Sequence, residues 1–208
     1  MTDFILVRHG ETVWHAENRY AGRTDVPLTD HGRDQAAALA LWAATASLTA
    51  VWSSPLARAR LTAAPAADAC GLIPRVDDRL YELDFGRGEG LTRNEMRQLF
   101  PDQVAAFLAD PVGSHLPGGE DPRRAAERAA ACLTGLAREQ PDGRILVVAH
   151  STLVRLLLCH LLGIPLADYR RVFPRLHNGA LTEIRIENGQ AALLSFNTPA
   201  LTQAPALH

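Results

Sequence analysis

The sequence predicts an α/β fold, a three-layer α/β/α sandwich whose mostly parallel sheet has an antiparallel edge. Short apolar runs alternate with longer stretches of helical periodicity, which is typical of a parallel sheet covered on both faces. Near the end of the chain, Asn188-Gly189 stands between two apolar runs and is a strong signal for an antiparallel hairpin. With 208 residues and 47% hydrophobic content, we expect one domain over residues 1–200 and a mobile tail at 201–208.

The strands of this sheet are expected where apolar runs are bounded by turn signals. In chain order these runs cover residues 4–7, 50–52, 73–76 and 145–149, and the hairpin strands cover 181–186 and 191–196. Because parallel strands present their carboxyl ends at one edge, the residues that follow the first four runs are expected to meet there.

Helices are expected over residues 29–47, 55–69, 92–109, 121–139 and 151–162. Three of their starts carry capping signals. Ser54-Pro55 supplies an N-cap and a first-turn proline, Thr92 and Glu95 form a capping box, and Asp121-Pro122 opens the fourth helix. The arginines of the fourth helix, Arg123, Arg124 and Arg128, are expected to be solvated on one face.

The composition favours a small-molecule substrate over a macromolecular partner. The formal net charge is −2 and no run of five like charges occurs, so nucleic-acid binding is not expected. All 21 basic residues are arginine, which excludes lysine-dependent chemistry such as a Schiff base. No apolar run approaches the roughly 20 residues of a membrane span, and no leader precedes the first strand. With three separated cysteines that suit free thiols, the sequence predicts a cytoplasmic protein without membrane contact.

Arg8 and His9 stand where the first apolar run ends, the position at which open α/β sheets build their sites. A positive charge beside an imidazole disfavours imidazolium, so Arg8 should keep His9 neutral and nucleophilic. The planar guanidinium fork of Arg8 suits a phosphate group. Alone, the pair also fits a hydrogen-bonded structural histidine.

Further segments bring chemistry to the same edge of the sheet. Arg58 lies in the first turn of the second expected helix, where backbone N–H groups and the helix dipole favour an anion, although a solvated helix arginine is the alternative. His150 follows the fourth apolar run as His9 follows the first, so both histidines are expected at one crevice. Glu82 lies in a loop between apolar residues, where partial burial favours the protonated carboxyl and makes it a candidate proton donor.

Several segments spread over nearly the whole chain form one ordered pattern. They are Arg8-His9-Gly10 with Glu11-Thr12, Asn18-Arg19-Tyr20 with Gly22, Pro27-Leu28-Thr29, the segment 53–63, Leu80-Tyr81-Glu82, Phe85-Gly86, Pro117-Gly118-Gly119-Glu120 and Val148-Ala149-His150. In this order and spacing the chain resembles the histidine phosphatase superfamily, also called the phosphoglycerate mutase-like family.

The resemblance implies a phosphoglycerate mutase-like fold and a phosphomonoesterase that needs no metal and no cofactor. It implies that His9 takes up the phosphoryl group and that Glu82 protonates the leaving oxygen and then activates water. Arg8, Arg58 and His150 would hold the phosphoryl oxygens. Further residues expected to bind phosphate or substrate are His15, Asn18, Gly22, Arg23, Thr24 and Ser151.

Three positions depart from the family pattern. His15 stands where the pattern has an asparagine that touches phosphate, and a histidine there can still donate to an anion. Ser151 replaces a glycine after the second histidine. Gly88 replaces a tryptophan, which is expected to widen the pocket.

Three functions are compatible with these residues. The first is hydrolysis of a small phosphomonoester by a monomer or homodimer. The second is phosphoglycerate mutase-type transfer back to substrate, although cofactor-dependent mutases carry a longer insertion after the acid. The third is a phospho-ligand binding protein with weak catalysis, against which the presence of His9, Glu82 and their basic partners argues.

The sequence leaves the identity of the substrate open. Arg23, Arg87 and Arg93 are candidates for contact with a second anionic group, or are surface arginines. His115 and His177 lie in loops that could approach a substrate. Specificity is expected in such loops, because the sheet itself positions the chemistry.

Overall fold

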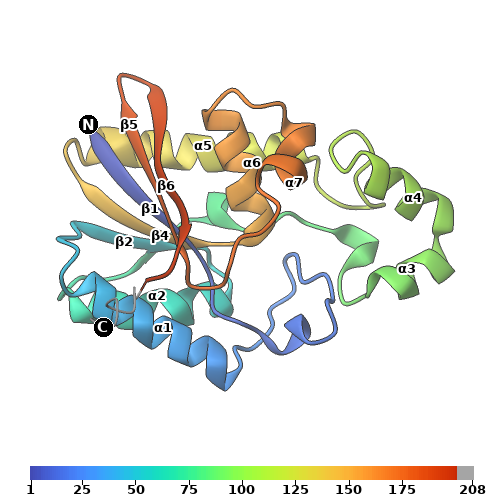
Figure 1. Ribbon diagram of the computed structural model, residues 1–208, viewed down its shortest axis with the longest axis horizontal. Coiled ribbons are helices and arrows are strands. Elements are labelled where there is room, and N and C mark those ends of the chain that lie inside the picture. Colours follow the sequence, from blue (N-terminus) through green and yellow to red (C-terminus); the bar gives the residue numbers. More distant parts are fainter. Residues whose placement is uncertain (201–208) are drawn as a thin grey trace, which may run out of the picture.

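The computed structural model describes residues 1–200 and has a six-stranded sheet in the order β3-β2-β4-β1-β5-β6 (Figure 1). The parallel strands are β1 (Thr2–Arg8), β2 (Ala50–Ser53), β3 (Arg75–Val76) and β4 (Arg144–Ala149). The antiparallel edge is formed by β5 (Leu181–Glu187) and β6 (Gln190–Thr198). The predicted α/β fold with an antiparallel edge is therefore confirmed, and the predicted tail at 201–208 lies outside the described residues.

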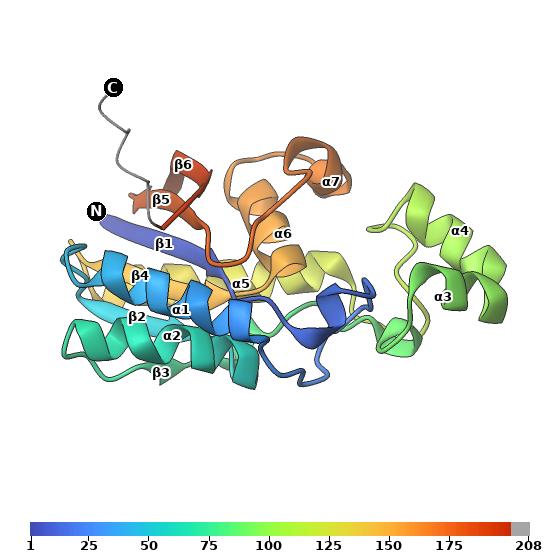
Figure 2. The same cartoon turned by 60° about the horizontal axis from the view of Figure 1, so that its bottom comes forward.

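Helices cover both faces of the sheet because alternate side chains of the central strands enter two different cores. From β1, Phe4 and Leu6 pack into one core, while Ile5 and Val7 pack into the other. The first core includes α5 (Pro122–Glu139) and α6 (Ser151–Leu161). The second includes α1 (Asp30–Ala43) and α2 (Ala57–Ala69), which lie together in front of β4 and β2 in Figure 2. The three layers of the predicted sandwich follow from this alternation.

The start of α2 differs from the prediction that Ser54 and Pro55 would open the helix. The helix begins two residues later, after Leu56, which has no side-chain cap. The Ala57 N–H group instead donates to the carboxylate of Asp25, at 2.9 and 3.1 Å. The cap comes from a distant loop, so no local signal marks it.

The single helix predicted over residues 92–109 is two helices, α3 (Arg93–Leu99) and α4 (Pro101–Ala109). The capping box at Thr92 is present as predicted. The break falls at Phe100, whose backbone angles of φ −151° and ψ 66° are not helical. Proline disfavours helical geometry in the residue before it, and Pro101 follows at once. The pair stands out from the layered body and forms a lobe, residues 93–109, at one end of the molecule (Figures 1 and 2).

The remaining elements are short. Helix α7 covers Tyr169–Val172, and single 3₁₀ turns occur at Val13–His15, Asp78–Leu80, Gly86–Gly88 and Leu166–Asp168. The hairpin predicted at Asn188-Gly189 is present, and both residues have positive φ, at 50° and 78°. No helix among residues 1–200 is both long enough and apolar enough to cross a membrane.

Neighbouring parallel strands fix the position of the site. Strand β1 pairs directly with β4, and the last pair in their register joins Arg8 to Ala149. The residues that follow, His9 and His150, therefore leave adjacent strands at the same level. This places them at the carboxyl edge, where open α/β sheets bind ligands.

Candidate active site

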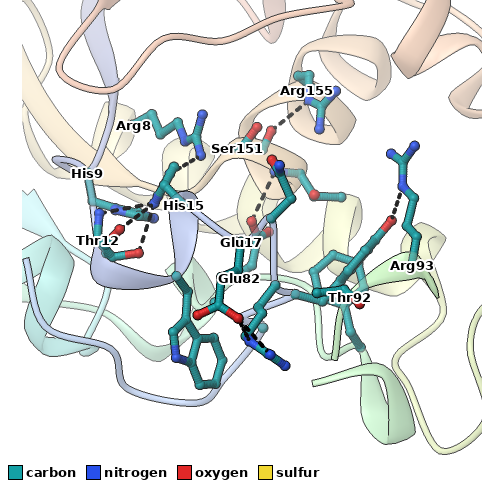
Figure 3. A pocket seen from close by; sticks show the side chains of 18 of the residues that line it. Arg8, His9, Thr12, His15, Glu17, Glu82, Thr92, Arg93, Ser151 and Arg155 are labelled. Carbon is teal, nitrogen blue, oxygen red and sulfur yellow. Dashed lines mark hydrogen bonds and ion pairs between the residues drawn. The ribbon is translucent and has the colours of Figure 1, made fainter. Parts of the chain in front are cut away.

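A cavity of about 880 Å³ opens at the carboxyl ends of β1 and β4 (Figure 3). Most of the residues predicted for the site line this cavity, namely Arg8, His9, His15, Asn18, Gly22, Arg58, Glu82 and Ser151. His150, Arg23 and Thr24 were also predicted for the site, but they do not line the cavity. The loop after β1, the starts of α3 and α6, and α7 supply its walls.

The turn after β1 holds its backbone close to the start of α1. A Cβ atom on Gly10 would collide with the carbonyl oxygen of Gly32, and one on Gly32 would collide with the carbonyl oxygen of Glu11. The Gly10 N–H group also donates to Thr62 Oγ1 at 3.0 Å. These contacts fix the backbone beside His9 between α1 and α2.

His9 is buried and has one ring nitrogen available for chemistry. Its Nδ1 lies 2.7 Å from the carbonyl oxygen of Gly10. A carbonyl oxygen only accepts, so Nδ1 carries the proton and Nε2 keeps its lone pair. Burial, followed by the charges of Arg58 and Arg8, holds the pKa of His9 well below its usual value. At neutral pH the ring is neutral, as a nucleophile requires.

His150 packs against His9 beneath the cavity. The ring centroids are 5.1 Å apart, and the His150 side chain is fully buried. Burial, followed by the charges of Arg58 and His9, holds the pKa of His150 well below its usual value. Neither of its ring nitrogens has a hydrogen-bond partner among the described residues. Unpaired buried nitrogens are costly, so they mark a place where a polar ligand atom would be favourable.

Arg8 is held in place by two contacts, and its buried Nε has no partner among the described residues. Its guanidinium donates to the carbonyl oxygen of Leu176 at 2.8 Å and to His15 Nε2 at 2.6 Å. Burial lowers the pKa of Arg8 to about 10, so the side chain stays charged at neutral pH.

His15 accepts hydrogen bonds at Nε2, where the sequence suggested a donor to phosphate. Both groups that approach Nε2, the Arg8 guanidinium and the Asn178 amide at 3.3 Å, are donors. Burial, followed by the charge of Arg8, lowers the pKa of His15, which favours the neutral ring that can accept. His15 therefore orients Arg8 (Figure 3).

Arg58 is 1% exposed, and its guanidinium holds the loop of residues 22–24. It donates to the carbonyl oxygens of Thr24 and Gly22 at 2.7 and 2.6 Å. Its Nε is buried without a partner among the described residues, as in Arg8. Burial lowers the pKa of Arg58. The Nε of each of the two arginines is thus a buried donor.

Arg23 and Thr24, predicted to bind substrate, have other contacts. Thr24 donates through its backbone and hydroxyl groups to Glu89. Arg23 lies over the Tyr81 ring, 5.2 Å from its centroid, with its Nε 3.9 Å from the Asp84 carboxylate. Both residues shape the loop outside the cavity.

Glu82 is buried in a loop that packs against the start of α6, and its carboxylate accepts three backbone hydrogen bonds. Its Oε1 accepts from Leu83 and Leu153, both at 2.8 Å, and its Oε2 accepts from Thr152 at 3.0 Å. Two of these N–H groups belong to the first turn of α6, where the helix dipole favours negative charge. The helix that begins after His150 therefore also positions Glu82.

The Glu82 loop has a positioning contact that the sequence did not predict. Arg128, expected to be solvated, forms a two-point ion pair with Glu120 at 2.8 and 2.9 Å. It also donates to the backbone carbonyl oxygens of Arg79 and Glu82, at 2.6 and 3.2 Å. Arg128 thereby ties the Glu82 loop to α5. The motif that contains Glu120 was the one sequence signal for this contact, because the carbonyl groups of Arg79 and Glu82 lie 49 and 46 residues from Arg128 in the sequence.

Several residues that the sequence placed near the substrate lie away from the cavity. Gly88, expected to widen the pocket, faces the core, where a Cβ atom would meet Leu116 Cδ1 at 2.5 Å. Arg87 is exposed and stacks on Phe100, with 5.2 Å to the ring centroid, outside the cavity wall. The loop histidines His115 and His177 do not line the cavity either. Of the three arginines suggested for a second anion, only Arg93 does.

The buried neutral histidines predict a loss of stability in mild acid. His9 and His150 have a lowered pKa in the folded protein, while the unfolded chain takes up their protons near the ordinary value of 6.5. Their contribution is therefore fully present above pH 6.5 and is lost as pH falls below it. Each group weakens the free energy of unfolding by up to about 1.4 kcal/mol per pH unit in that range.

Urea unfolding at about pH 7.5 and about pH 5.5 measures this loss. The substitution His9→Asn should remove one histidine's share of it. His160→Asn, at an exposed position on α6, should leave the loss unchanged. A free energy of unfolding that stays constant over this range would contradict the neutral assignment.

The fold and the cavity define the class as an α/β protein with a cavity lined by histidine and arginine side chains at the carboxyl edge of its sheet. A model of the histidine phosphatase superfamily (branch 1) matches residues 4–199. The chain belongs to this superfamily, and the resemblance found in the sequence is confirmed.

Relatives of known name have related activities. A phosphoserine phosphatase 1 of Hydrogenobacter thermophilus is 29% identical over 197 residues, which cover 95% of this chain and 92% of the relative. A probable phosphoglycerate mutase GpmB of Salmonella choleraesuis is 33% identical over 190 residues, with coverage of 91% and 87%. The solved structure of YhfR from Bacillus stearothermophilus aligns with a TM-score of 0.88 at 29% identity, covering 95% of this chain and 98% of that one. The superfamily and the names of the first two relatives indicate phosphatase or mutase activity.

The side chains available for a metal are limited. Among residues 1–200, no group of three or more His, Cys, Asp or Glu side chains is arranged to hold a metal ion. Beside His9, positive charge comes from Arg8 and Arg58, which lie on two different elements.

Proposed function

We propose that the chain is a metal-independent phosphomonoesterase that hydrolyses a small-molecule ester through a phosphohistidine at His9. The observation that carries this proposal is the free Nε2 of a neutral His9 in the same cavity as two arginines with unpartnered Nε donors. Phosphoryl transfer needs in-line positioning and neutralisation of charge on three oxygens, and this set supplies both.

In the first half-reaction His9 Nε2 attacks phosphorus and the ester P–O bond breaks. Arg8 and Arg58 donate to the phosphoryl oxygens, and His150 offers a third contact from beneath His9. Glu82 gives its proton to the leaving oxygen, so the alcohol departs neutral.

In the second half-reaction water attacks the phosphorus of phosphohistidine and the P–N bond breaks. The Glu82 carboxylate, now without its proton, takes one from the water. Inorganic phosphate leaves and His9 returns to its neutral form.

A second candidate is phosphoglycerate mutase activity. The 33% identity to a probable mutase supports it. The same phosphohistidine would then return its phosphoryl group to substrate. The two functions differ only in the acceptor, which is water in one and an alcohol in the other.

Phosphate release from a panel of phosphomonoesters in excess EDTA tests the proposal. We expect release at the same rate with and without EDTA, because Arg8 and Arg58 supply the positive charge. Interconversion of 2- and 3-phosphoglycerate that outpaces release would favour the mutase. Ester binding without turnover would favour a phospho-ligand binding protein.

The compartment is proposed on separate grounds. All three cysteines, Cys70, Cys132 and Cys159, are free. Burial raises the pKa of the Cys132 thiol to about 12 and that of Cys159 to about 11, so both are unreactive. Free thiols suit a reducing compartment, which supports the cytoplasmic assignment.

A further inference from the structure

Five arginines in the wall of the active-site cavity have no part in the proposed reaction, and three of them contact one group of aromatic side chains. These three are Arg93 at the start of α3, Arg155 on α6 and Arg170 on α7. In Figure 3, Arg155 and Arg93 lie on the side of the cavity away from His9. A substrate whose phosphoryl group meets His9 would extend toward them.

Two of these guanidinium groups are held by one buried tyrosine. The central carbon of Arg155 lies 5.1 Å from the Tyr169 ring centroid, and that of Arg170 lies 5.4 Å from it. Arg170 also donates through Nε to the Tyr169 hydroxyl at 2.9 Å. Tyr169 is only 2% exposed, so the platform is rigid. Cation–π contacts of this kind orient an arginine without neutralising it.

Contacts with the projecting lobe complete the arrangement. Arg170 stacks on Phe107 of α4, 4.7 Å from the ring centroid. The Tyr20 ring packs edge-on against Phe107, with centroids 6.1 Å apart. Arg93 donates to the Tyr20 hydroxyl at 3.3 Å. An aromatic cluster, Tyr20, Phe107 and Tyr169, thus carries all three arginines.

The positive charge of these arginines is not balanced within the described part of the chain. Their hydrogen-bond partners there are hydroxyl and backbone carbonyl groups, as in the bond from Arg155 Nε to the Ser151 carbonyl oxygen at 3.0 Å. By contrast, Arg19 at the same cavity is paired with Glu17 and Glu95. Arg155 and Arg170 are half-buried, and a half-buried guanidinium without a carboxylate favours the arrival of an anion.

We propose that Arg155 and Arg170, with Arg93 beside them, bind a second anionic group of the substrate, a carboxylate or a phosphate on its alcohol part. The inference rests on the proposed phosphatase function and names its substrate class, phosphomonoesters with two anionic groups. Both carboxylate and phosphate match the planar donor fork of arginine.

Matched pairs of esters test the proposal. O-phosphoserine differs from O-phosphoethanolamine by a carboxylate, and fructose 1,6-bisphosphate differs from fructose 6-phosphate by a phosphate. In at least one pair, kcat/KM should be about tenfold to a hundredfold higher for the ester with the second anion. The pair that shows the preference identifies the anion as carboxylate or phosphate.

Substitutions locate that preference. Arg155→Gln and Arg170→Gln should each reduce the ratio within the responsive pair by about tenfold. The control Arg87→Gln removes a guanidinium that also stacks on a phenylalanine but lies outside the cavity, so it should keep the ratio. Thermal unfolding of each variant checks folding, and the two cavity variants test the site independently.

Failure of the second-anion site and failure of the proposed phosphatase function give different results. Phosphate release with ratios near one in both pairs would overturn the second-anion site and leave the phosphatase standing. If no ester releases phosphate, the proposed function fails. Calorimetric affinities of the same pairs for the wild-type protein then decide: tighter binding of the doubly anionic ester supports the site, and equal affinities overturn it.

Discussion

Replacing His9 with alanine should lower the rate of phosphate release by at least about a thousandfold, the scale of loss when an enzyme nucleophile is removed. The methyl group has no lone pair, and water lacks the position that His9 has beside Arg8 and Arg58. Release is measured from the best ester of the panel. His115→Ala, an exposed position outside the cavity wall, is the matched control and should stay near the wild-type rate.

The same variant separates binding from chemistry. The guanidinium groups of Arg8 and Arg58 remain in His9→Ala, so inorganic phosphate should still bind with an affinity close to that of the wild type. Mass spectrometry of protein quenched during turnover should show a phosphoryl adduct in the wild type and none in the variant. Release within tenfold of the wild-type rate in His9→Ala would contradict a nucleophilic role.

The site residues that directly follow a strand, or that lie in the first turn of the next helix, could be predicted from the sequence. His9 and His150 each follow a buried run, and the pairing of β1 with β4 brings them together without further information. Arg58 lies in the first turn of α2 as predicted. Such positions depend on local patterns and on one rule of parallel sheets.

What could not be predicted depends on contacts between distant residues. The cap of α2 comes from Asp25, the acceptor role of His15 depends on Asn178, and the Glu82 loop is tied down by Arg128. None of these partners is marked by spacing or composition. Arg155 reads as an ordinary arginine of α6 until the fold brings Tyr169 beside it.

Glu82→Gln should lower phosphate release from alkyl phosphates by about a hundredfold to ten-thousandfold, the range of general acid–base catalysis. Glutamine cannot give a proton to the leaving oxygen or take one from water. It also places an amide donor against one of the N–H groups of Leu83, Thr152 and Leu153. We therefore expect a loss of about 1–3 kcal/mol in the free energy of unfolding.

The leaving group separates the two roles of Glu82. A nitrophenolate leaves without a proton, so the first half-reaction of p-nitrophenyl phosphate should stay fast in Glu82→Gln. The second half-reaction lacks its base, so phosphohistidine should accumulate. A stopped-flow trace should then show a burst of nitrophenol close to the enzyme concentration, followed by slow turnover.

The substitution Glu17→Gln is the control for the Glu82→Gln experiment. Glu17→Gln also removes a carboxylate that lines the cavity, but Glu17 is exposed and paired with Arg19, so the variant should show no burst. If Glu82→Gln gave no burst and kept its activity toward alkyl phosphates, proton transfer would belong to another group. Since the Glu82 carboxylate is held by the first turn of α6, directly after His150, that result would also make its three backbone hydrogen bonds a device for stability alone.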